Sequence, residues 1–357
     1  MKVDVVHFSR RPQAGQHSIE KVFELIRKEL PERFRVVTVT SGYYSKGLRQ
    51  RVATVLEARR IATPVVHVLG DVTYAALARP SESTVVTIHD AEFLRRGSPA
   101  KNFVYSWLWL RLPAQHAAVV TVPSAATLRE LEALGASEAS SLRLIPHPVS
   151  DAFFASQQQP GRSDAAAPPR VLVVGTAPNK NLPAVAEALE GSGAEVVVVG
   201  RLDAAQRGAF AKARVAVLEM GTLPDEAMPA LYKDADVLAF VSTTEGFGVP
   251  ILEAQASGLA VVTSDLEPHR DVAGGAARLV DPRDPVSIRA GIDAVLADDS
   301  YRRRLVEAGR RNAKGFSPAR IASMYAEVYD EVAELRPPRR SHRLRAARST
   351  PLRHSLW

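Results

Sequence analysis

Short apolar runs rich in β-branched residues recur along this 357-residue chain, and helical patterns separate most of them. A short apolar run bounded by turn signals is typical of a strand buried on both faces of a parallel sheet. Because parallel strands need crossover connections, the alternation predicts doubly wound α/β domains with parallel sheets. The strands predicted in the first half are Val3–Phe8, Phe34–Thr40, Val65–Leu69, Thr84–Ile88, Val119–Val122 and Leu142–Ile145. Those predicted in the second half are Val171–Gly175, Glu195–Gly200, Val215–Leu218, Asp236–Val241, Ala260–Thr263 and Ala277–Val280.

The strongest break in composition lies between these two sets of strands. Residues 156–170 read SQQQPGRSDAAAPPR and show no periodicity, which predicts a linker. The chain therefore divides into an N-terminal domain (1–155), a linker (156–169), a C-terminal domain (170–335) and a tail (336–357). In such domains ligands bind at the carboxyl ends of the strands and in the cleft between domains. Three helices are predicted to close the chain, at about 284–296, 299–313 and 317–334.

Composition excludes several classes of site. The chain has no cysteine, which excludes disulfides, thiolate metal sites and cysteine nucleophiles. No stretch approaches 18 apolar residues, so no membrane span is predicted. The first residues, MKVDVVHFSRRP, contain too short an apolar run for a signal peptide. A cytoplasmic location is the resulting expectation.

The net charge of +7 arises from the C-terminal tail. Residues 336–357 contain seven arginines and no acid, which leaves 46 − 7 = 39 basic residues against 39 acidic ones in the rest of the chain. The neutral body and the lack of a recognition motif argue against nucleic-acid binding. The Pro- and Ser-interrupted tail predicts disorder. We favour an inert solubilising end, and peripheral contact with anionic lipid at the inner membrane face is the alternative.

Two carboxylates, Glu245 and Glu253, flank the start of a predicted helix that follows a predicted strand. Pro250 suits the first turn, where its missing N–H costs nothing. Gly246 and Gly248 let the backbone approach a ligand, and the free N–H groups of a helix start attract anions. Because carboxylates repel phosphate, we expect them to bind hydroxyls on either side of one, as in a sugar nucleotide. The plainer alternative is a helix start whose acids favour the helix dipole.

The segment from Arg170 to Asp284 resembles the donor-binding domain of glycosyltransferase family 4, one of the group 1 glycosyltransferases. The resemblance rests on VLVVGTAPNKNLPAVAEAL, EVVVVG and LPDEAMPALYKDADVLAFVSTTEGFGVPILEAQASGLAVVTSDLEPHRDVAGGAARLVDPRDP. The N-terminal half matches more loosely, through TVVTIHD and VVTVPSAATLRELEALGASEASSLRLIPHPVSDAFF. Its first loop, Ser9–His17, departs from the family because it has only Gly15 in place of a glycine-rich run. The resemblance implies a GT-B fold, in which two Rossmann-like domains face a central cleft.

The same resemblance implies a retaining hexosyltransferase. It would move a sugar from a nucleoside diphosphate to a hydroxyl acceptor, in the synthesis of cell-surface polysaccharide, lipopolysaccharide or glycolipid. The N-terminal domain would bind the glycan or glycolipid acceptor, and the C-terminal domain would bind the nucleotide sugar. An alternative from another class is a non-catalytic protein that binds sugar nucleotides or glycans on the same scaffold.

Roles for individual residues also follow from the resemblance. Glu245 would contact the transferred sugar, Glu253 the ribose hydroxyls, and Lys180 the leaving diphosphate. Arg201 is a candidate to replace an arginine that many members carry beside the lysine, and His89 would approach the donor sugar from the acceptor domain. The expected catalytic residues are thus His89, Glu245 and Lys180. The expected nucleotide-sugar contacts are Gly175, Asn179, Lys180, Arg201, Gly246, Phe247, Gly248, Val249, Ile251, Leu252 and Glu253.

Other motifs carry weaker signals. The DAD triplet at 234–236 copies the D-x-D metal motif of other glycosyltransferases, but it straddles a helix end and a strand start, which favours a structural role. No other cluster has metal-ligand spacing, so we expect no metal and no cofactor besides the sugar-nucleotide co-substrate. The aromatic segment Asn102–Leu112 (NFVYSWLWLRL) favours an amphipathic core helix over an acceptor wall or a lipid-facing helix. His67, His116 and His147 are expected to be structural.

Overall fold

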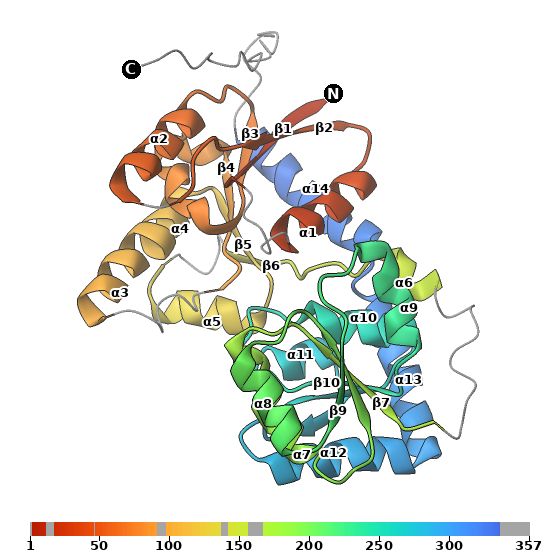
Figure 1. Ribbon diagram of the computed structural model, residues 1–357. Helices are drawn as coiled ribbons and strands as arrows, with labels where there is room; N and C mark the ends of the chain where they lie inside the picture. Colours follow the sequence, from red (N-terminus) through yellow and green to blue (C-terminus); the bar gives the residue numbers. More distant parts are fainter. Residues whose placement is uncertain are drawn as a thin grey trace, which may run out of the picture.

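The computed structural model of the chain describes residues 2–11, 18–45, 47–90, 98–136, 142–155 and 167–335. These residues form two α/β domains, one above the other in Figure 1, and each contains a six-stranded sheet whose neighbouring strands are parallel. The prediction of two doubly wound parallel sheets is confirmed. The predictions for the tail at 336–357, for most of the linker and for the loop at 12–17 lie outside the described residues.

The N-terminal sheet has the strand order β2-β1-β3-β4-β5-β6. Its strands are β1 (Val3–Ser9), β2 (Phe34–Thr40), β3 (Val65–Val68), β4 (Thr84–Thr87), β5 (Val119–Val122) and β6 (Leu142–Leu144). The helical segments among and after them are α1 (Ser18–Glu29), α2 (Gly47–Arg59), the 3₁₀ segments η1 (Gly70–Ala78) and η2 (Ser81–Ser83), α3 (Pro99–Tyr105), the π-helix η4 (Ser106–Arg111), α4 (Leu112–His116), α5 (Ala125–Ala133) and α6 (Asp151–Ala155).

The C-terminal sheet has the order β12-β11-β10-β7-β8-β9. Its strands are β7 (Arg170–Val174), β8 (Glu195–Val199), β9 (Ala216–Glu219), β10 (Val237–Phe240), β11 (Val261–Ser264) and β12 (Arg278–Val280). The helical segments are η7 (Pro178–Lys180), α7 (Leu182–Ala188), α8 (Ala204–Lys212), η8 (Asp225–Ala227), α9 (Met228–Lys233), α10 (Val249–Ser257), α11 (His269–Ala273), α12 (Pro285–Ala297), α13 (Asp299–Lys314) and α14 (Pro318–Glu334). The strand order reverses between β7 and β10. Doubly wound sheets bind ligands at such a topological switch point.

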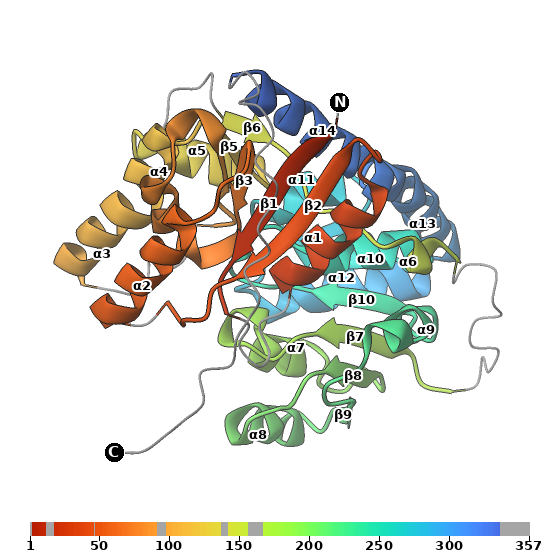
Figure 2. The same ribbon diagram turned by 90° about the horizontal axis from the view of Figure 1, so that it is seen from above.

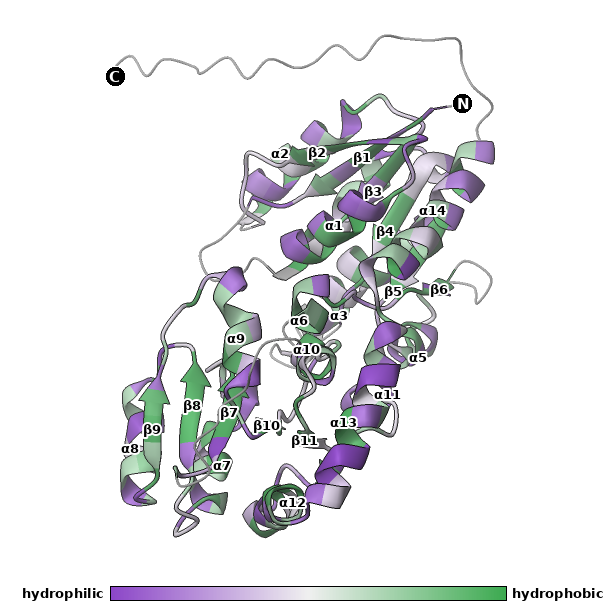
Figure 3. Ribbon diagram, turned by 90° about the vertical axis from the view of Figure 1, so that its right-hand side faces the viewer, coloured by the Kyte–Doolittle hydropathy of each residue, from purple (hydrophilic) through white to green (hydrophobic). Residues whose placement is uncertain are grey.

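Every predicted strand is present, with ends within one residue of those expected from the sequence. The predictions are accurate because most strand side chains are buried. In the central strands, such as β3, β4, β10 and β11, the side chains are buried on both faces, so each of these strands is a nearly continuous apolar run, whereas the edge strands β2 and β9 are partly exposed. Figure 3 shows this as hydrophobic colour along β8, whereas α13 carries hydrophilic residues. Among the described residues, no helix combines the length and the apolar character that crossing a membrane requires.

The last helix, α14, packs against the N-terminal domain, although the sequence-based boundary assigned it to the C-terminal one. Its Ile321, Tyr325 and Tyr329 share a buried cluster with Val5 and Phe23. Figure 1 shows α14 beside α1, and Figure 2 shows α13 and α14 following one another along one side of the molecule. The predicted C-terminal domain, residues 170–335, should therefore end before α14, because residues 318–334 complete the N-terminal core.

The two chain crossings between the domains touch each other. The amide of Val149, which leaves the N-terminal sheet, donates a 2.9 Å hydrogen bond to the carbonyl of Phe316, which precedes α14. The two domains are therefore joined by a pair of bonded segments rather than by one strand of chain.

Candidate active site

The loop after β7 places Lys180 across the end of the C-terminal sheet. Gly175 has a φ of +93°, and a Cβ there would lie 2.9 Å from Lys180 Cε. Glycine is therefore needed to let the lysine fold back over the strand end. The Lys180 Nζ lies 4.6 Å from the centre of the Phe240 ring, at the end of β10. A cation is thus fixed between β7 and β10, at the switch point of the sheet.

Glu245, in the loop after β10, meets this cation. Lys180 Nζ donates to Glu245 Oε1 at 2.5 Å, and each side chain is 16% exposed. Asn179 Nδ2 donates to the same Oε1 at 3.1 Å and to the carbonyl of Thr244 at 2.8 Å. The residue beside the lysine thus orients the carboxylate and brings no charge. Lys180, Glu245 and Asn179 are brought together as a site.

The start of α10 has the backbone that the sequence predicts. Gly248 is the N-cap, with a left-handed φ of +105°, and Pro250 lies in the first turn. The Ile251 amide donates to the Gly248 carbonyl at 3.0 Å, so this expected ligand donor is already used inside the helix. The Phe247 side chain is packed between the domains, with ring-centre distances of 5.1 Å to His147 and 6.2 Å to Phe316. Any contact of Phe247 with a ligand must therefore use its backbone.

Glu253, one turn into α10, is held by a tyrosine. The buried hydroxyl of Tyr232, on α9, donates to Glu253 Oε2 at 2.6 Å. Burial raises the pKa of Glu253 to about 7, against opposing contributions from the Tyr232 hydrogen bond and from Lys21 and Lys180, while Asp225 adds to the rise. The carboxyl therefore changes charge near neutral pH. This perturbation is typical of ligand-binding sites.

His89 faces this machinery from the N-terminal domain, at the end of β4. Its Nδ1 lies 3.3 Å from Nε2 of His147. A Cβ added to Gly246 would lie 3.1 Å from the His89 carbonyl oxygen, and Ser124 Oγ donates to the Gly246 carbonyl at 3.2 Å. The glycine loop of one domain thus touches strand ends of the other, so the residue after Glu245 packs against the backbone of His89.

The His89 ring is neutral. Burial, then His147, His67 and Arg10, lower its pKa well below the usual value. Its Nε2 is buried and lacks a hydrogen-bond partner among the described residues. A neutral imidazole offers one donor and one acceptor, which suits a hydroxyl ligand.

Two ion pairs join the two domains. Lys21, on α1, pairs with Asp225 at 2.5 Å, and Arg129, on α5, pairs with Glu267. Arg201 is exposed after β8 and has no ion pair or side-chain hydrogen bond within the described part of the chain. Its phosphate contact stays a prediction.

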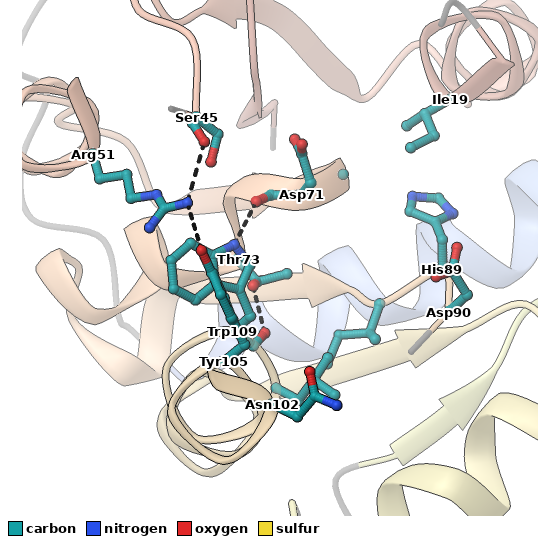
Figure 4. A pocket seen from close by; sticks show the side chains of 13 residues that line it. Ile19, Ser45, Arg51, Asp71, Thr73, His89, Asp90, Asn102, Tyr105 and Trp109 are labelled. Carbon is teal, nitrogen blue, oxygen red and sulfur yellow. Dashed lines mark hydrogen bonds between the residues drawn. The ribbon is translucent and has the colours of Figure 1, made fainter. Parts of the chain in front are cut away.

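A pocket of about 340 Å³ adjoins His89 inside the N-terminal domain (Figure 4). The π-helix η4 helps to shape it, and π-helices recur at functional sites. The aromatic segment is therefore a pocket wall as well as a core element, whereas Phe103 is 64% exposed. The pocket is lined by Ile19, Ser45, Arg51, Gly70, Asp71, Thr73, Ile88, His89, Asp90, Asn102, Tyr105, Trp109 and Leu110.

The sequence interpretation missed two residues of the site, Tyr232 and His147. His147 follows β6 at the same edge of the sheet as His89, and this shared position after a strand was a usable signal. Tyr232 had none, because its contact with Glu253 depends on how α9 packs on α10. Among the described residues, no cluster of three His, Cys, Asp or Glu side chains could hold a metal ion. Asp236 of the DAD triplet instead accepts a 2.7 Å bond from the Arg170 amide.

Comparison with known families identifies the half that carries Lys180 and both glutamates. Residues 159–312 match the sequence model of the family described as glycosyl transferases group 1. This segment is thus similar to the group 1 glycosyl transferases, the family that the motifs resemble.

Two curated relatives match parts of the chain. O-antigen chain mannosyltransferase B of Escherichia coli is 42% identical over 98 residues, which are 28% of this chain and 26% of that protein. Phosphatidyl-myo-inositol mannosyltransferase of Mycobacterium tuberculosis is 34% identical over 148 residues, 39% of either chain. The chain thus spans between about a quarter and two fifths of the length of these relatives.

Solved structures match nearly the whole chain. HepE of Anabaena, crystallised with UDP-glucose, superposes with a TM-score of 0.74 at 17% identity and covers 92% of this chain and 99% of its own. Sucrose-phosphate synthase of Thermosynechococcus elongatus gives 0.72 at 18%, covering 93% and 99%. The GT-B fold is confirmed.

Proposed function

We propose that this protein is a retaining glycosyltransferase. It moves a hexose-type sugar from a nucleoside diphosphate to a hydroxyl acceptor, in the synthesis of a cell-surface polysaccharide, lipopolysaccharide or glycolipid. The observation that carries the proposal is the Lys180–Glu245 pair, bound at 2.5 Å at the switch point of the C-terminal sheet, next to the contact of Gly246 with the His89 backbone. The mannosyltransferase names of the two curated relatives support a hexose and a glycoconjugate product.

The charges of the site suit a diphosphate between two polyols. A diphosphate at Lys180 competes with Glu245 for the ammonium group, which frees the carboxylate to accept hydrogen bonds from the donor sugar. Glu253 accepts bonds from the ribose. During transfer the bond from the anomeric carbon to the phosphate oxygen breaks, and the acceptor oxygen bonds to the same face of that carbon. The acceptor proton passes to the leaving phosphate oxygen, and Lys180 stabilises the charge that builds up on the diphosphate.

Two variants test the division of roles. Glu253→Ala should weaken nucleotide binding, and Glu245→Ala should lower turnover more than binding. Glu226, which is exposed on η8, offers a matched control as Glu226→Ala. The measurements are calorimetric titrations with UDP, GDP and ADP, and release of nucleoside diphosphate from UDP-, GDP- and ADP-sugars with a hydroxyl acceptor. Equal loss of nucleotide affinity in both variants would contradict the separate roles.

The second candidate is a non-catalytic protein that binds sugar nucleotides or glycans. It shares the fold and the cation, so only turnover separates it from the enzyme. Nucleotide binding without release of nucleoside diphosphate, for all three donor classes and with the acceptors supplied, would favour it. The contact of His89 with the glycine loop favours the enzyme, because binding of the nucleotide alone does not need an acceptor domain in contact with the donor loop.

A further inference from the structure

The pocket beside His89 contains a cation that forms no ion pair within the described part of the chain. Arg51, on α2, is the only Lys or Arg among the described residues that line the pocket. Its guanidinium lies 4.5 Å from the ring centre of Trp109 and 5.4 Å from that of Tyr105. It donates to the Tyr105 hydroxyl at 3.2 Å and to the Ser45 carbonyl at 3.5 Å, and its Nε is buried without a partner. No carboxylate pairs with it among the described residues.

Burial of the unpaired Arg51 Nε costs free energy unless a ligand accepts its hydrogen bond. Burying a donor of a charged group without an acceptor costs more than leaving it in water. The two aromatic rings hold the guanidinium plane in one orientation, so its free N–H groups are already positioned for a ligand. Guanidinium groups held in this way recognise the oxyanions of phosphate and carboxylate by two parallel hydrogen bonds.

The opposite end of the pocket is suited to hydroxyls. Figure 4 shows His89 and Asp90 on the side away from Arg51, with Asp71 between the two ends. Neutral His89 and the aspartates accept hydrogen bonds from hydroxyl groups. Asp71 also receives a 3.3 Å bond from Arg10, which offsets part of its charge. The pocket therefore runs from an anion-binding end to a hydroxyl-binding end that opens beside the donor loop.

The volume of the pocket limits the size of its ligand. About 340 Å³ lies at the small end of ligand pockets, which span roughly 300–1,000 Å³. Such a volume suits a single sugar-sized group rather than several sugar units.

We propose that the acceptor of this protein carries an oxyanion, a phosphate or a carboxylate, next to its sugar-sized polyol, and that Arg51 binds this oxyanion while a hydroxyl faces His89. The proposal rests on the proposed function, because it takes this pocket as the acceptor site. The oxyanion belongs either to a free sugar phosphate or sugar acid, or to the headgroup of a phospholipid or lipid-linked sugar.

Binding of small probes tests the proposal without knowledge of the true acceptor. The probes are glucose, glucose 1-phosphate, glucuronate and inorganic phosphate, titrated by calorimetry into the full chain. We expect glucose 1-phosphate or glucuronate to bind about 10-fold or more tightly than glucose, as a charge-assisted hydrogen bond implies. Arg51→Gln should remove this preference. Arg49→Gln, two residues away on the same helix and exposed, should keep it.

A lipid arm separates the two sources of the oxyanion. Vesicles of phosphatidylglycerol in phosphatidylcholine are compared with vesicles of phosphatidylcholine alone. Binding of the phosphatidylglycerol vesicles that Arg51→Gln weakens indicates a lipid headgroup. Because the basic tail is unchanged in that variant, attraction through the tail cancels in the comparison. The same effect with soluble glucose 1-phosphate alone indicates a free sugar phosphate.

Several outcomes would overturn the proposal. One is equal affinity of the wild type for glucose and for its charged analogues, or no binding of any probe. Another is a preference for the anion that survives in Arg51→Gln, because the anion then binds elsewhere, for instance at Lys180. Arg51→Lys, which keeps the charge, should retain part of the preference, and a melting curve for each variant excludes misfolding. Transfer from nucleotide sugars to neutral acceptors, measured with the same proteins, reports separately on the proposed function.

Discussion

Replacing Tyr232 with phenylalanine should change how nucleotide binding depends on pH. The Tyr232 hydroxyl donates to Glu253 at 2.6 Å and so favours the ionised carboxylate, whose pKa burial has raised to about 7. A hydrogen bond to a charged group contributes about 1.5–3 kcal/mol, and one pKa unit corresponds to about 1.4 kcal/mol. Loss of the hydroxyl should therefore raise the pKa of Glu253 further, by about one unit at the lower end of this range.

The size of the effect follows from the ionised fraction of Glu253. Ribose hydroxyls bind the carboxylate better than the neutral acid, so affinity rises with pH through the pKa of Glu253. At pH 7 the ionised fraction falls from about one half to about one tenth when the pKa moves from about 7 to about 8. Tyr232→Phe should bind nucleoside diphosphate about fivefold more weakly at pH 7 and almost normally at pH 9.

Calorimetric titration of the best-binding nucleoside diphosphate, from pH 6 to pH 9, measures this convergence. Ionisation of the phosphate affects both proteins equally and cancels in the ratio of their affinities. Tyr325→Phe is the matched control, because Tyr325 is equally buried but lies in the N-terminal core. A constant loss of affinity at every pH would refute the reasoning, since it would show a packing defect rather than a shifted titration.

Three further outcomes are expected. Gly175→Ala should displace Lys180 and weaken nucleotide binding by calorimetry, whereas Gly191→Ala, which also has a positive φ but open space around its Cβ, should lower only the melting temperature; equal affinities would contradict the packing argument. In denaturant titrations of the unliganded protein, Glu253→Gln should have a free energy of unfolding about 2 kcal/mol higher than that of the wild type at pH 8, but not at pH 5. The folded wild type keeps the Glu253 proton to about pH 7, whereas the unfolded carboxyl loses it near pH 4.5, so wild-type stability falls as the pH rises between these values. A difference in stability that does not depend on pH would contradict the raised pKa. EDTA should leave sugar transfer intact, and a loss restored by Mn²⁺ would show that a metal replaces Lys180 in neutralising the diphosphate.

The central strands were predictable because they are buried on both faces, so each one can be recognised from a local apolar run. The same holds for the start of α10, where Gly248 and Pro250 have backbone requirements that few other residues meet. The site residues after β7 and β10 were found by resemblance, and topology brings them together at the switch point.

Packing between distant elements was not predictable. The attachment of α14 to the first sheet depends on Tyr325 and Tyr329 meeting Phe23 across about 300 residues of sequence. The pairing of Tyr232 with Glu253 and of His89 with His147 depends in the same way on how elements pack. The aromatic segment was expected in the core, where Trp109 does lie, but the sequence did not show that Tyr105 and Trp109 also line a cavity.

The return of α14 to the first domain has a consequence for dissecting this protein. Cutting the chain at the linker would leave residues 1–155 without Ile321, Tyr325 and Tyr329, which cover one face of their sheet. The other fragment would carry the same side chains on a helix with nothing to cover them. A fragment that ends near residue 315 should therefore be the better-behaved C-terminal piece, while the N-terminal piece should become soluble only when α14 is supplied in trans or fused after residue 155.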